Sequence, residues 1–200
     1  FLKWIGGKRQ LLSQLQENLP VGLGDNITTY VEPFLGGGAL FFYLTSTCSF
    51  QHVVLNDQNI MLVNAYRQIQ NNPQQVVTCL QNIAQQYEDA ENVEEKKKLY
   101  YDKRVAYNAI VSRAMTTTQT GTYDNIFNYQ PVGVDAAALM IFLNRTCFNG
   151  LYRVNSKGLF NSPFGYYKHV NNIDKANIFA VSDMLSSTVL LTGGYENVEK

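Results

Sequence analysis

The hydrophobic and polar positions of this chain follow two periods, one typical of short buried strands and one typical of amphipathic helices. Short apolar runs that end at Glu32 and Leu55 predict two strands, and the run within 187–195 predicts a third strand followed by a turn. Apolar residues spaced three and four positions apart predict helices. We expect these helices over 8–19, from 39 onward, and over 58–71, 73–87, 93–114 and 135–145.

The predicted elements are unevenly distributed along the chain. Strands, turns and helices alternate near both ends, whereas the pattern from 58 to 145 is helical throughout. This arrangement predicts an α/β domain with a separate helical layer inserted into it. A polar, low-complexity run over 116–121 predicts a mobile surface loop within the insertion.

A turn of three glycines, Gly36 to Gly38, lies between the first predicted strand and its helix. Glycine brings bare backbone N–H groups close to a ligand, because it has no Cβ and can take φ > 0. A dinucleotide fingerprint would require glycine where Phe41 stands, and a P-loop would require Lys-Ser/Thr where Ala39 and Leu40 stand. The turn alone supports ligand binding and a purely structural role about equally.

Two charged residues strengthen the ligand-binding interpretation. Asp57 stands at the tip of the second strand, where nucleotide-binding α/β folds hold ribose hydroxyls. It is also compatible with capping a helix that begins at Gln58, and the two roles do not exclude each other. Lys8, in the first turn of a predicted helix, opposes the helix dipole. A carboxylate ligand would explain its presence, and a solvated lysine is the alternative.

Composition narrows the class of protein. A chain of 200 residues that is 46% hydrophobic can bury a sizeable core. The three cysteines are widely spaced and only two histidines occur, which argues against a disulfide framework and a metal site and favours the cytoplasm. No apolar run approaches the roughly 20 residues needed to span a membrane, and no signal peptide is evident.

The charge distribution changes the picture given by the formal net charge of zero. A neutral chain argues against nucleic acid as a partner. However, the segment 136–172 contains no Asp or Glu, while acids concentrate in 88–95. The basic residues of the acid-free segment are Arg145, Arg153, Lys157 and Lys168, together with His169. A neutral protein can therefore still present one basic face.

The segment 144–168 combines basic, aromatic and amide residues between Asn-Gly and Lys-Gly turns, which predicts a hairpin. This composition suits nucleic acid, because Arg can bind guanine edges and an aromatic side chain can wedge between base steps. The alternative is an aromatic-rich loop that packs on its own domain, which fits Phe160 and Phe164 better than Leu151 and Arg153.

Four motifs in this order resemble the Dam family (class D12) of DNA adenine-N6 methyltransferases. They are Lys3-Trp4-Ile5-Gly6-Gly7-Lys8, Glu32-Pro33-Phe34-Leu35-Gly36-Gly37-Gly38, Asn56-Asp57, and the segment from Phe148 to Gly165. The resemblance runs from Phe1 to about Lys168 and returns faintly at 190–195. It implies methyl transfer from S-adenosylmethionine to N6 of adenine in double-stranded DNA, usually within GATC, by base flipping.

The resemblance implies a Rossmann-like methyltransferase fold, incomplete at its C-terminus, with an inserted helical and β-hairpin DNA-recognition domain. The cofactor-binding domain would comprise 1–57 and 176–200, and the recognition domain 58–175. The implied cofactor-binding residues are Trp4, Lys8, Phe34, Gly36, Gly37, Gly38, Asp57 and Gln58. The implied DNA-binding residues are Lys3, Arg145, Phe148, Asn149, Leu151, Arg153, Asn155, Pro163, Tyr167 and Lys168.

One motif of that family is absent. Its catalytic Asp-Pro-Pro-Tyr is expected shortly beyond Tyr195, but the sequence contains no Pro-Pro pair, so no catalytic residue is assigned in this chain. This absence suggests an N-terminal portion of a methyltransferase. A first residue that is not Met suggests that a terminus has been cut or renumbered. We expect a monomer from a bacterial or phage-infected cell. The alternative is a DNA- or cofactor-binding module without turnover.

Overall fold

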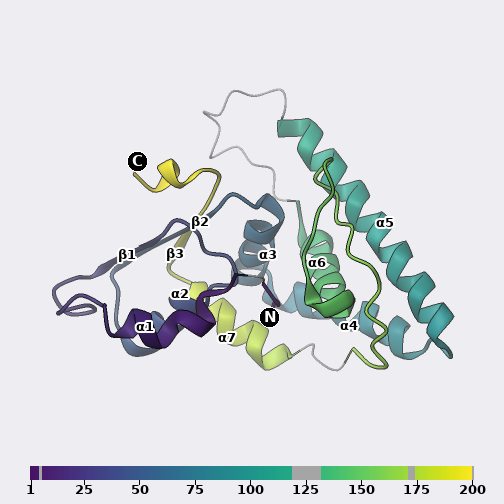
Figure 1. The fold of residues 1–200 in the computed structure, drawn as a ribbon, viewed down its shortest axis with the longest axis horizontal. Helices are drawn as coiled ribbons and strands as arrows, with labels where there is room; N and C mark the ends of the chain where they lie inside the picture. The colour runs from purple at the N-terminus through teal and green to yellow at the C-terminus, as the bar shows by residue number, and fades with distance from the viewer. Residues whose placement is uncertain (5, 119–131, 171–173, 200) are drawn as a thin grey trace.

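The computed structural model describes residues 1–4, 6–118, 132–170 and 174–199. A parallel sheet of three strands, in the order β1-β2-β3, lies at one end of the molecule (Figure 1). The strands are β1 (Thr29–Glu32), β2 (His52–Asp57) and β3 (Thr188–Thr192). All three predicted strands are confirmed. Because the strands are parallel, their carboxyl ends meet at one edge of the sheet.

The two faces of the sheet differ in burial. Val53, Leu55 and Leu190 are buried, whereas Val31 and Val189 on the alternate positions are exposed. This period of two follows from the pleat, which points successive side chains to opposite faces. The helix that follows β2 packs against β2 and β3, so the buried core of the sheet continues into the helical part of the chain.

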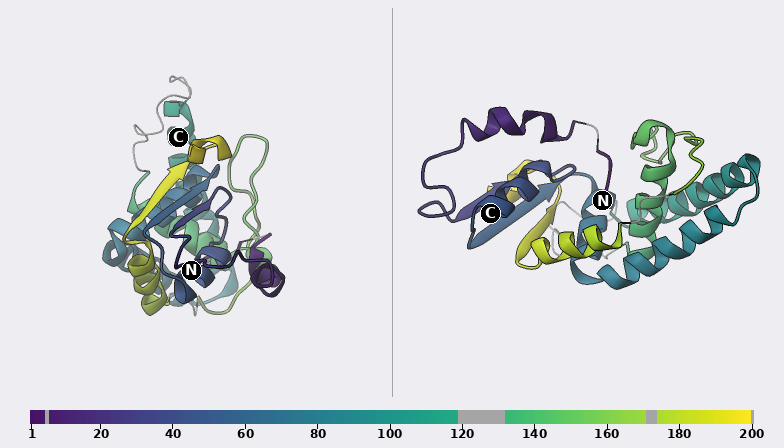
Figure 2. Two further views of the ribbon diagram at one scale, coloured as in Figure 1. Left: turned by 90° about the vertical axis from the view of Figure 1, so that its left-hand side faces the viewer. Right: turned by 90° about the horizontal axis from the view of Figure 1, so that it is seen from below.

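Helices make up most of the remaining structure (Figures 1 and 2). The α-helices are α1 (Leu12–Gln16), α2 (Ala39–Thr47), α3 (Ile60–Asn71), α4 (Pro73–Glu88), α5 (Val93–Thr118), α6 (Val134–Thr146) and α7 (Lys175–Leu185). The 3-10 helices are η1 (Lys8–Leu11), η2 (Phe148–Gly150) and η3 (Tyr195–Glu199). Helix α6 is buried over most of its length and contacts α3, α4 and α5, so it forms the centre of the helical layer.

The structure corrects three predicted helix boundaries and adds one helix. The helix expected over 8–19 begins as a 3-10 turn and ends at Gln16, and Pro20 disfavours the α conformation at Leu19, the residue where we expected the helix to end. Helix α3 begins at Ile60 rather than Gln58. Helix α5 continues to Thr118, so the loop prediction is wrong for 116–118, while 119–121 lie outside the described residues. Helix α7 was not predicted at all.

The predicted hairpin of 144–168 is only partly correct. Its two arms run antiparallel, but they meet in isolated bridges, Cys147 with Phe164 and Val154 with Phe160, and form no regular strand within 144–168. Side chains of α5 supply hydrogen bonds that a ladder would otherwise provide, with Tyr100 Oη donating to Ser162 O at 2.8 Å. We call the segment 147–170 the recognition segment, after the role that the family resemblance implies for it.

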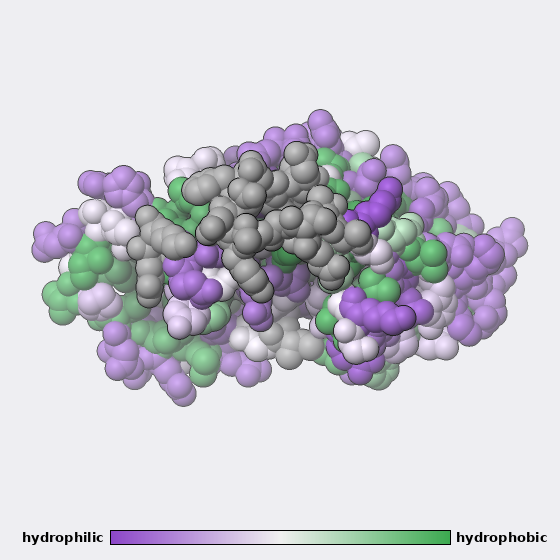
Figure 3. Space-filling model, turned by 90° about the horizontal axis from the view of Figure 1, so that it is seen from above, coloured by the Kyte–Doolittle hydropathy of each residue, from purple (hydrophilic) through white to green (hydrophobic). Residues whose placement is uncertain are grey.

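The face of the helical part that Figure 3 shows is mainly polar at its outer end. The end formed by α5, at the right of Figure 3, presents mainly hydrophilic residues. In the described part of the chain, no helix has both the length and the hydrophobicity that crossing a bilayer requires.

Shortening a buried side chain of the central strand β2 should destabilise the fold far more than shortening an exposed side chain of β3. Leu55 is fully buried in β2, so Leu55→Ala should lower the free energy of unfolding by about 2–5 kcal/mol. Val189 is 52% exposed in β3. Val189→Ala, the matched control, should change the stability by less than about 1 kcal/mol. Urea denaturation followed by circular dichroism measures the stability of both variants. Equal losses of stability would show that the buried face of the sheet is not the core of the α/β part.

Candidate functional site

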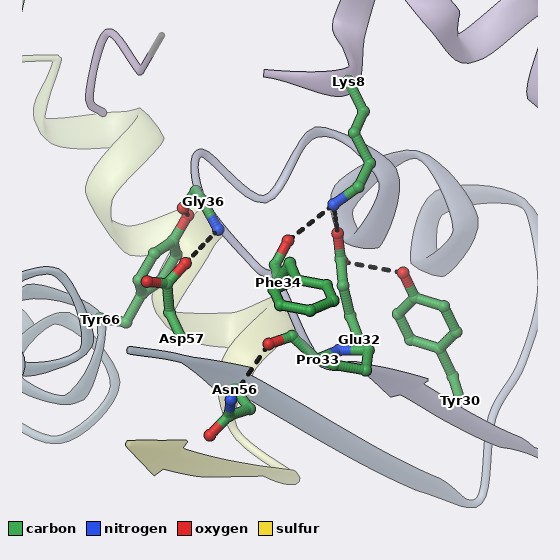
Figure 4. Close-up of polar contacts among 9 residues, drawn as sticks. All are labelled: Lys8, Tyr30, Glu32, Pro33, Phe34, Gly36, Asn56, Asp57 and Tyr66. Carbon is green, nitrogen blue, oxygen red and sulfur yellow. Dashed lines mark hydrogen bonds and ion pairs between the residues drawn. The ribbon is translucent and has the colours of Figure 1, made fainter. Parts of the chain in front are cut away.

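At the carboxyl edge of the sheet, the buried side-chain amide of Asn56 connects the ends of all three strands. Asn56 Nδ2 donates to Pro33 O at 3.0 Å, just beyond β1, and to Gly193 O at 3.1 Å, just beyond β3. Figure 4 shows Asn56 beneath Pro33 and beside Asp57. In open α/β sheets, ligands bind outside this edge.

The glycine turn between β1 and α2 has a fixed, internally bonded shape. Gly36 and Gly38 have φ of +52° and +70°, a region that glycine adopts without strain. Gly36 N–H donates to Asp57 Oδ2 at 2.8 Å, and Tyr66 Oη donates to Gly36 O at 3.0 Å. Gly38 N–H donates to Leu35 O. Two of the three N–H groups that we expected to face a ligand are therefore used inside the protein.

Asp57 organises the turn rather than capping the next helix. Its Oδ1 accepts from Asn59 N–H at 2.9 Å, while Asn59 itself is the N-cap of α3 and accepts from Met61 and Leu62. An ionised carboxylate has about four lone-pair positions, so Asp57 retains acceptor capacity for a ligand. Burial raises the pKa of Tyr66, with the charges of Glu32 and Asp57 adding to the effect, so its hydroxyl remains a donor.

Lys8 is partly exposed, but its ammonium group has partners inside the protein. Its Nζ lies 2.7 Å from Glu32 Oε1 and donates to Phe34 O at 2.7 Å (Figure 4). Tyr30 Oη donates to the other carboxylate oxygen of Glu32. The ammonium has three N–H donors, so one remains for a ligand. Glu32 was missed by the sequence analysis, although an acid at the end of a buried strand is itself a signal of an internal partner.

Trp4 lies directly against the glycine turn. A Cβ added at Gly36 or Gly37 would come within 3.1 Å of the Trp4 side chain, which explains the small residues there. Phe34 is 65% exposed and its ring centroid lies 6.2 Å from that of Tyr195. The structure therefore brings the predicted cofactor residues to one edge, with the exposed Gln58 beside Asp57.

Most of the predicted DNA-binding side chains are exposed on the recognition segment or beside it. Phe148 is 52% exposed, and Asn149 takes a left-handed conformation with φ of 55°. The other exposed members of the predicted set are Lys3, Arg153, Asn155, Pro163 and Lys168. Lys3 Nζ lies 5.4 Å from the centroid of the half-buried Tyr167 ring, which ties the N-terminal segment to the recognition segment.

Three of these residues also have internal roles. Arg145 Nε donates to Phe1 O at 2.9 Å, and burial of the half-buried guanidinium lowers its pKa. Asn155 Oδ1 accepts from Lys157 and Leu159 N–H and so closes the turn of the recognition segment. Leu151 is half-buried, and its carbonyl accepts from Ser162 Oγ. Sequence patterns do not distinguish such internal bonds from ligand contacts.

Other features of the described residues lie away from this edge. A surface cavity of about 670 Å³ lies between α4, α5 and the start of α6, and none of the predicted site residues line it. Its lining includes Cys79 and Asp135, whose side chains hydrogen bond to each other at 3.6 Å. Within the described ranges, no group of three or more His, Cys, Asp or Glu side chains could hold a metal ion.

The parallel sheet, with a glycine turn and an acidic strand tip at the edge where open α/β sheets bind ligands, makes this an α/β protein with a candidate ligand site beside a segment rich in aromatic and basic residues. The family model of the D12 class N6 adenine-specific DNA methyltransferases matches residues 4–200. The chain belongs to this family.

The curated relatives include type II methyltransferases and DNA adenine methylases. The chain is 38% identical to type II methyltransferase M.MjaIII of Methanocaldococcus jannaschii, over 100% of this chain and 63% of that protein. It is 37% identical to M1.LlaDCHI of Lactococcus lactis subsp. cremoris, over 100% and 60%. It is 32% identical to the DNA adenine methylase of Vibrio cholerae, over 84% and 48%. The chain thus spans about three fifths of the first two relatives.

Removing the charge of Lys8 should destabilise the protein measurably, because the carboxylate of Glu32 is only 4% exposed and would lose its ion-pair partner. We expect Lys8→Met to lower the free energy of unfolding by about 1–3 kcal/mol at pH 7. Lys98→Met removes an exposed pair with Asp102 and should lower it by less than about 1 kcal/mol. Chemical denaturation compares the variants, and similar values would mean that the Glu32 pair is no stronger than a surface contact.

Proposed function

We propose that the chain carries the cofactor-binding and DNA-recognition parts of an enzyme that transfers a methyl group from S-adenosylmethionine to N6 of adenine in double-stranded DNA. The observation that carries the proposal is the meeting of the glycine turn, Lys8 and Asp57 at one sheet edge, beside the exposed recognition segment. The family match over 4–200 supports it.

The residues at the sheet edge fit S-adenosylmethionine. The free acceptor positions of Asp57 suit the ribose hydroxyls, and the remaining N–H of Lys8 suits the carboxylate of the methionine part. The exposed ring of Phe34 supplies an apolar wall, and Gln58 would lie along the adenine. The bound cofactor supplies an electrophilic methyl group, while these residues hold and orient it.

The recognition segment and the N-terminal segment fit duplex DNA. The exposed Arg153 suits a bidentate contact to a guanine, and Lys3 suits the first guanine of the site, which is consistent with GATC as the recognition sequence. The exposed aromatic ring of Phe148 suits insertion where the target adenine leaves the stack. We infer that the α/β part comprises 1–57 and 176–200 and the DNA-recognition domain 58–175, acting as a monomer in the cytoplasm, where the DNA is.

The second candidate is a binding module without turnover, which the lack of any Pro-Pro pair in the sequence favours. Two observations separate the candidates. This polypeptide is incubated with methyl-labelled S-adenosylmethionine and a GATC duplex, and label transferred to adenine would rule out the module. Binding of both ligands without transfer is expected of either candidate, and a gene that ends at Lys200 would then favour the module.

Cofactor binding should depend on Asp57. Hydrogen bonds to a charged group contribute about 1.5–3 kcal/mol, so Asp57→Ala should weaken S-adenosylmethionine binding by roughly 10- to 100-fold. Asp102→Ala, which removes an exposed acid on α5, should leave the affinity unchanged. Isothermal titration calorimetry measures both. No binding by the wild type, or equal affinities in wild type and Asp57→Ala, would contradict the assignment of the cofactor site.

Two basic residues of the recognition segment should make different kinds of DNA contact, with Arg153 contacting a base and Lys168 contacting the phosphate backbone. Arg153→Ala should reduce discrimination between GATC and altered duplexes by about 1–3 kcal/mol, because a bidentate base contact is lost. Lys168→Ala should weaken binding alike on all duplexes and reduce the salt dependence, because a phosphate contact is lost. Fluorescence anisotropy at two salt concentrations tests both. Equal losses on specific and random duplexes for Arg153→Ala would refute its role.

A further inference from the structure

Tyr152 is a half-buried residue of the recognition segment that none of the predicted roles uses. Its ring stacks on Trp4 with centroids 5.2 Å apart and planes at 26°, and it packs on Phe160 at 5.3 Å. Its hydroxyl lies 3.0 Å from that of Tyr107 on α5. Burial raises the pKa of Tyr152, while hydrogen bonding with Tyr107 and Asn59 opposes the shift. Tyr152 thus contacts the N-terminal segment, its own recognition segment and helix α5.

On its other side, Trp4 is in contact with the glycine turn. A methyl group between them would fit only tightly, since a Cβ on Gly37 would lie 3.1 Å from Trp4 Cβ and Trp4 would have to shift by a few tenths of an ångström. Close-packed groups of this kind cannot move independently. A displacement of the turn is therefore transmitted to the indole ring and from there to the ring of Tyr152.

The backbone beside Trp4 is also fixed to the base of the recognition segment. The fully buried Asn144 accepts from Lys3 N–H at 2.7 Å and donates to Lys3 O at 2.8 Å and to Gly150 O at 3.1 Å. The Trp4 to Tyr152 stack therefore lies on a rigid connection rather than between two loose loops.

We propose that Tyr152 is a positioning residue that couples the glycine turn to the recognition segment, so that a ligand at one changes the affinity at the other. The proposal rests on the proposed function, because it takes the two ligands to be S-adenosylmethionine and duplex DNA. The ring carries the coupling through Trp4, and the hydroxyl anchors the ring to α5.

The test is a thermodynamic cycle. The dissociation constant of S-adenosylmethionine is measured by calorimetry with and without a saturating GATC duplex. The ratio should be about fivefold or more in the wild type and should fall to about 1 in Tyr152→Leu. Tyr152→Phe, which keeps the stacked ring, should retain most of the ratio. Tyr166→Leu, in the same segment but with its ring on Phe164, should retain all of it.

A purely structural role for Tyr152 would alter stability and both affinities but not their ratio, and an unchanged ratio in Tyr152→Leu would overturn the proposal. A wild-type ratio of 1 would overturn it too, with the proposed function intact. Failure of the wild type to bind either ligand would instead count against the proposed function.

A second measurement tests the connection without any ligand. Gly37 does not have a positive φ, so Gly37→Ala perturbs chiefly the contact with Trp4. This variant should change the emission of Trp4, the single tryptophan of the chain, and speed hydrogen exchange at Asn155 and Asn161, whose N–H groups bond across the recognition segment. In a Tyr152→Leu background the effect of Gly37→Ala on exchange should disappear. Unchanged exchange in Gly37→Ala alone would overturn the coupling.

Discussion

The amide of Asn56 is the interaction on which the proposed site depends. It is 1% exposed and donates to backbone carbonyls beyond both neighbouring strands, so the three carboxyl ends are held together by one side chain. The glycine turn and Asp57 then add their own bonds to an edge that is already fixed. A ligand site built this way needs little reorganisation when the ligand arrives, which favours affinity.

The N-terminal segment connects this edge to the rest of the molecule. Lys8 reaches the end of β1, Trp4 covers the glycine turn, and Lys3 is held by Asn144 at the end of α6. This short N-terminal segment thus contacts three parts of the molecule that are far apart in the sequence. The views in Figures 1 and 2 show this stretch between the sheet and the helical layer.

The sequence predicted the helices and strands better than the hydrogen bonds and ion pairs between them. The strands, the glycine turn and the position of Asp57 follow from local patterns, and the structure confirms their placement. The pairing of Lys8 with Glu32 and the use of Gly36 N–H by Asp57 are contacts between segments distant in sequence, which no local pattern encodes. The sequence predicted a hairpin for the recognition segment because the turn residues lie within that segment. The hydrogen-bond donors that replace a strand ladder lie on α5, far away in the sequence.

Those donors have an evolutionary consequence. Tyr100 and Asn108 hold the carbonyl groups of Ser162 and Phe160, so the path of the recognition segment is set through its main chain and not through strand propensity. Its outward-facing positions, such as Arg153, are therefore free to change without loss of the fold. On such a scaffold, the DNA contacts proposed for these positions would be able to change by single substitutions while the path of the main chain stays the same.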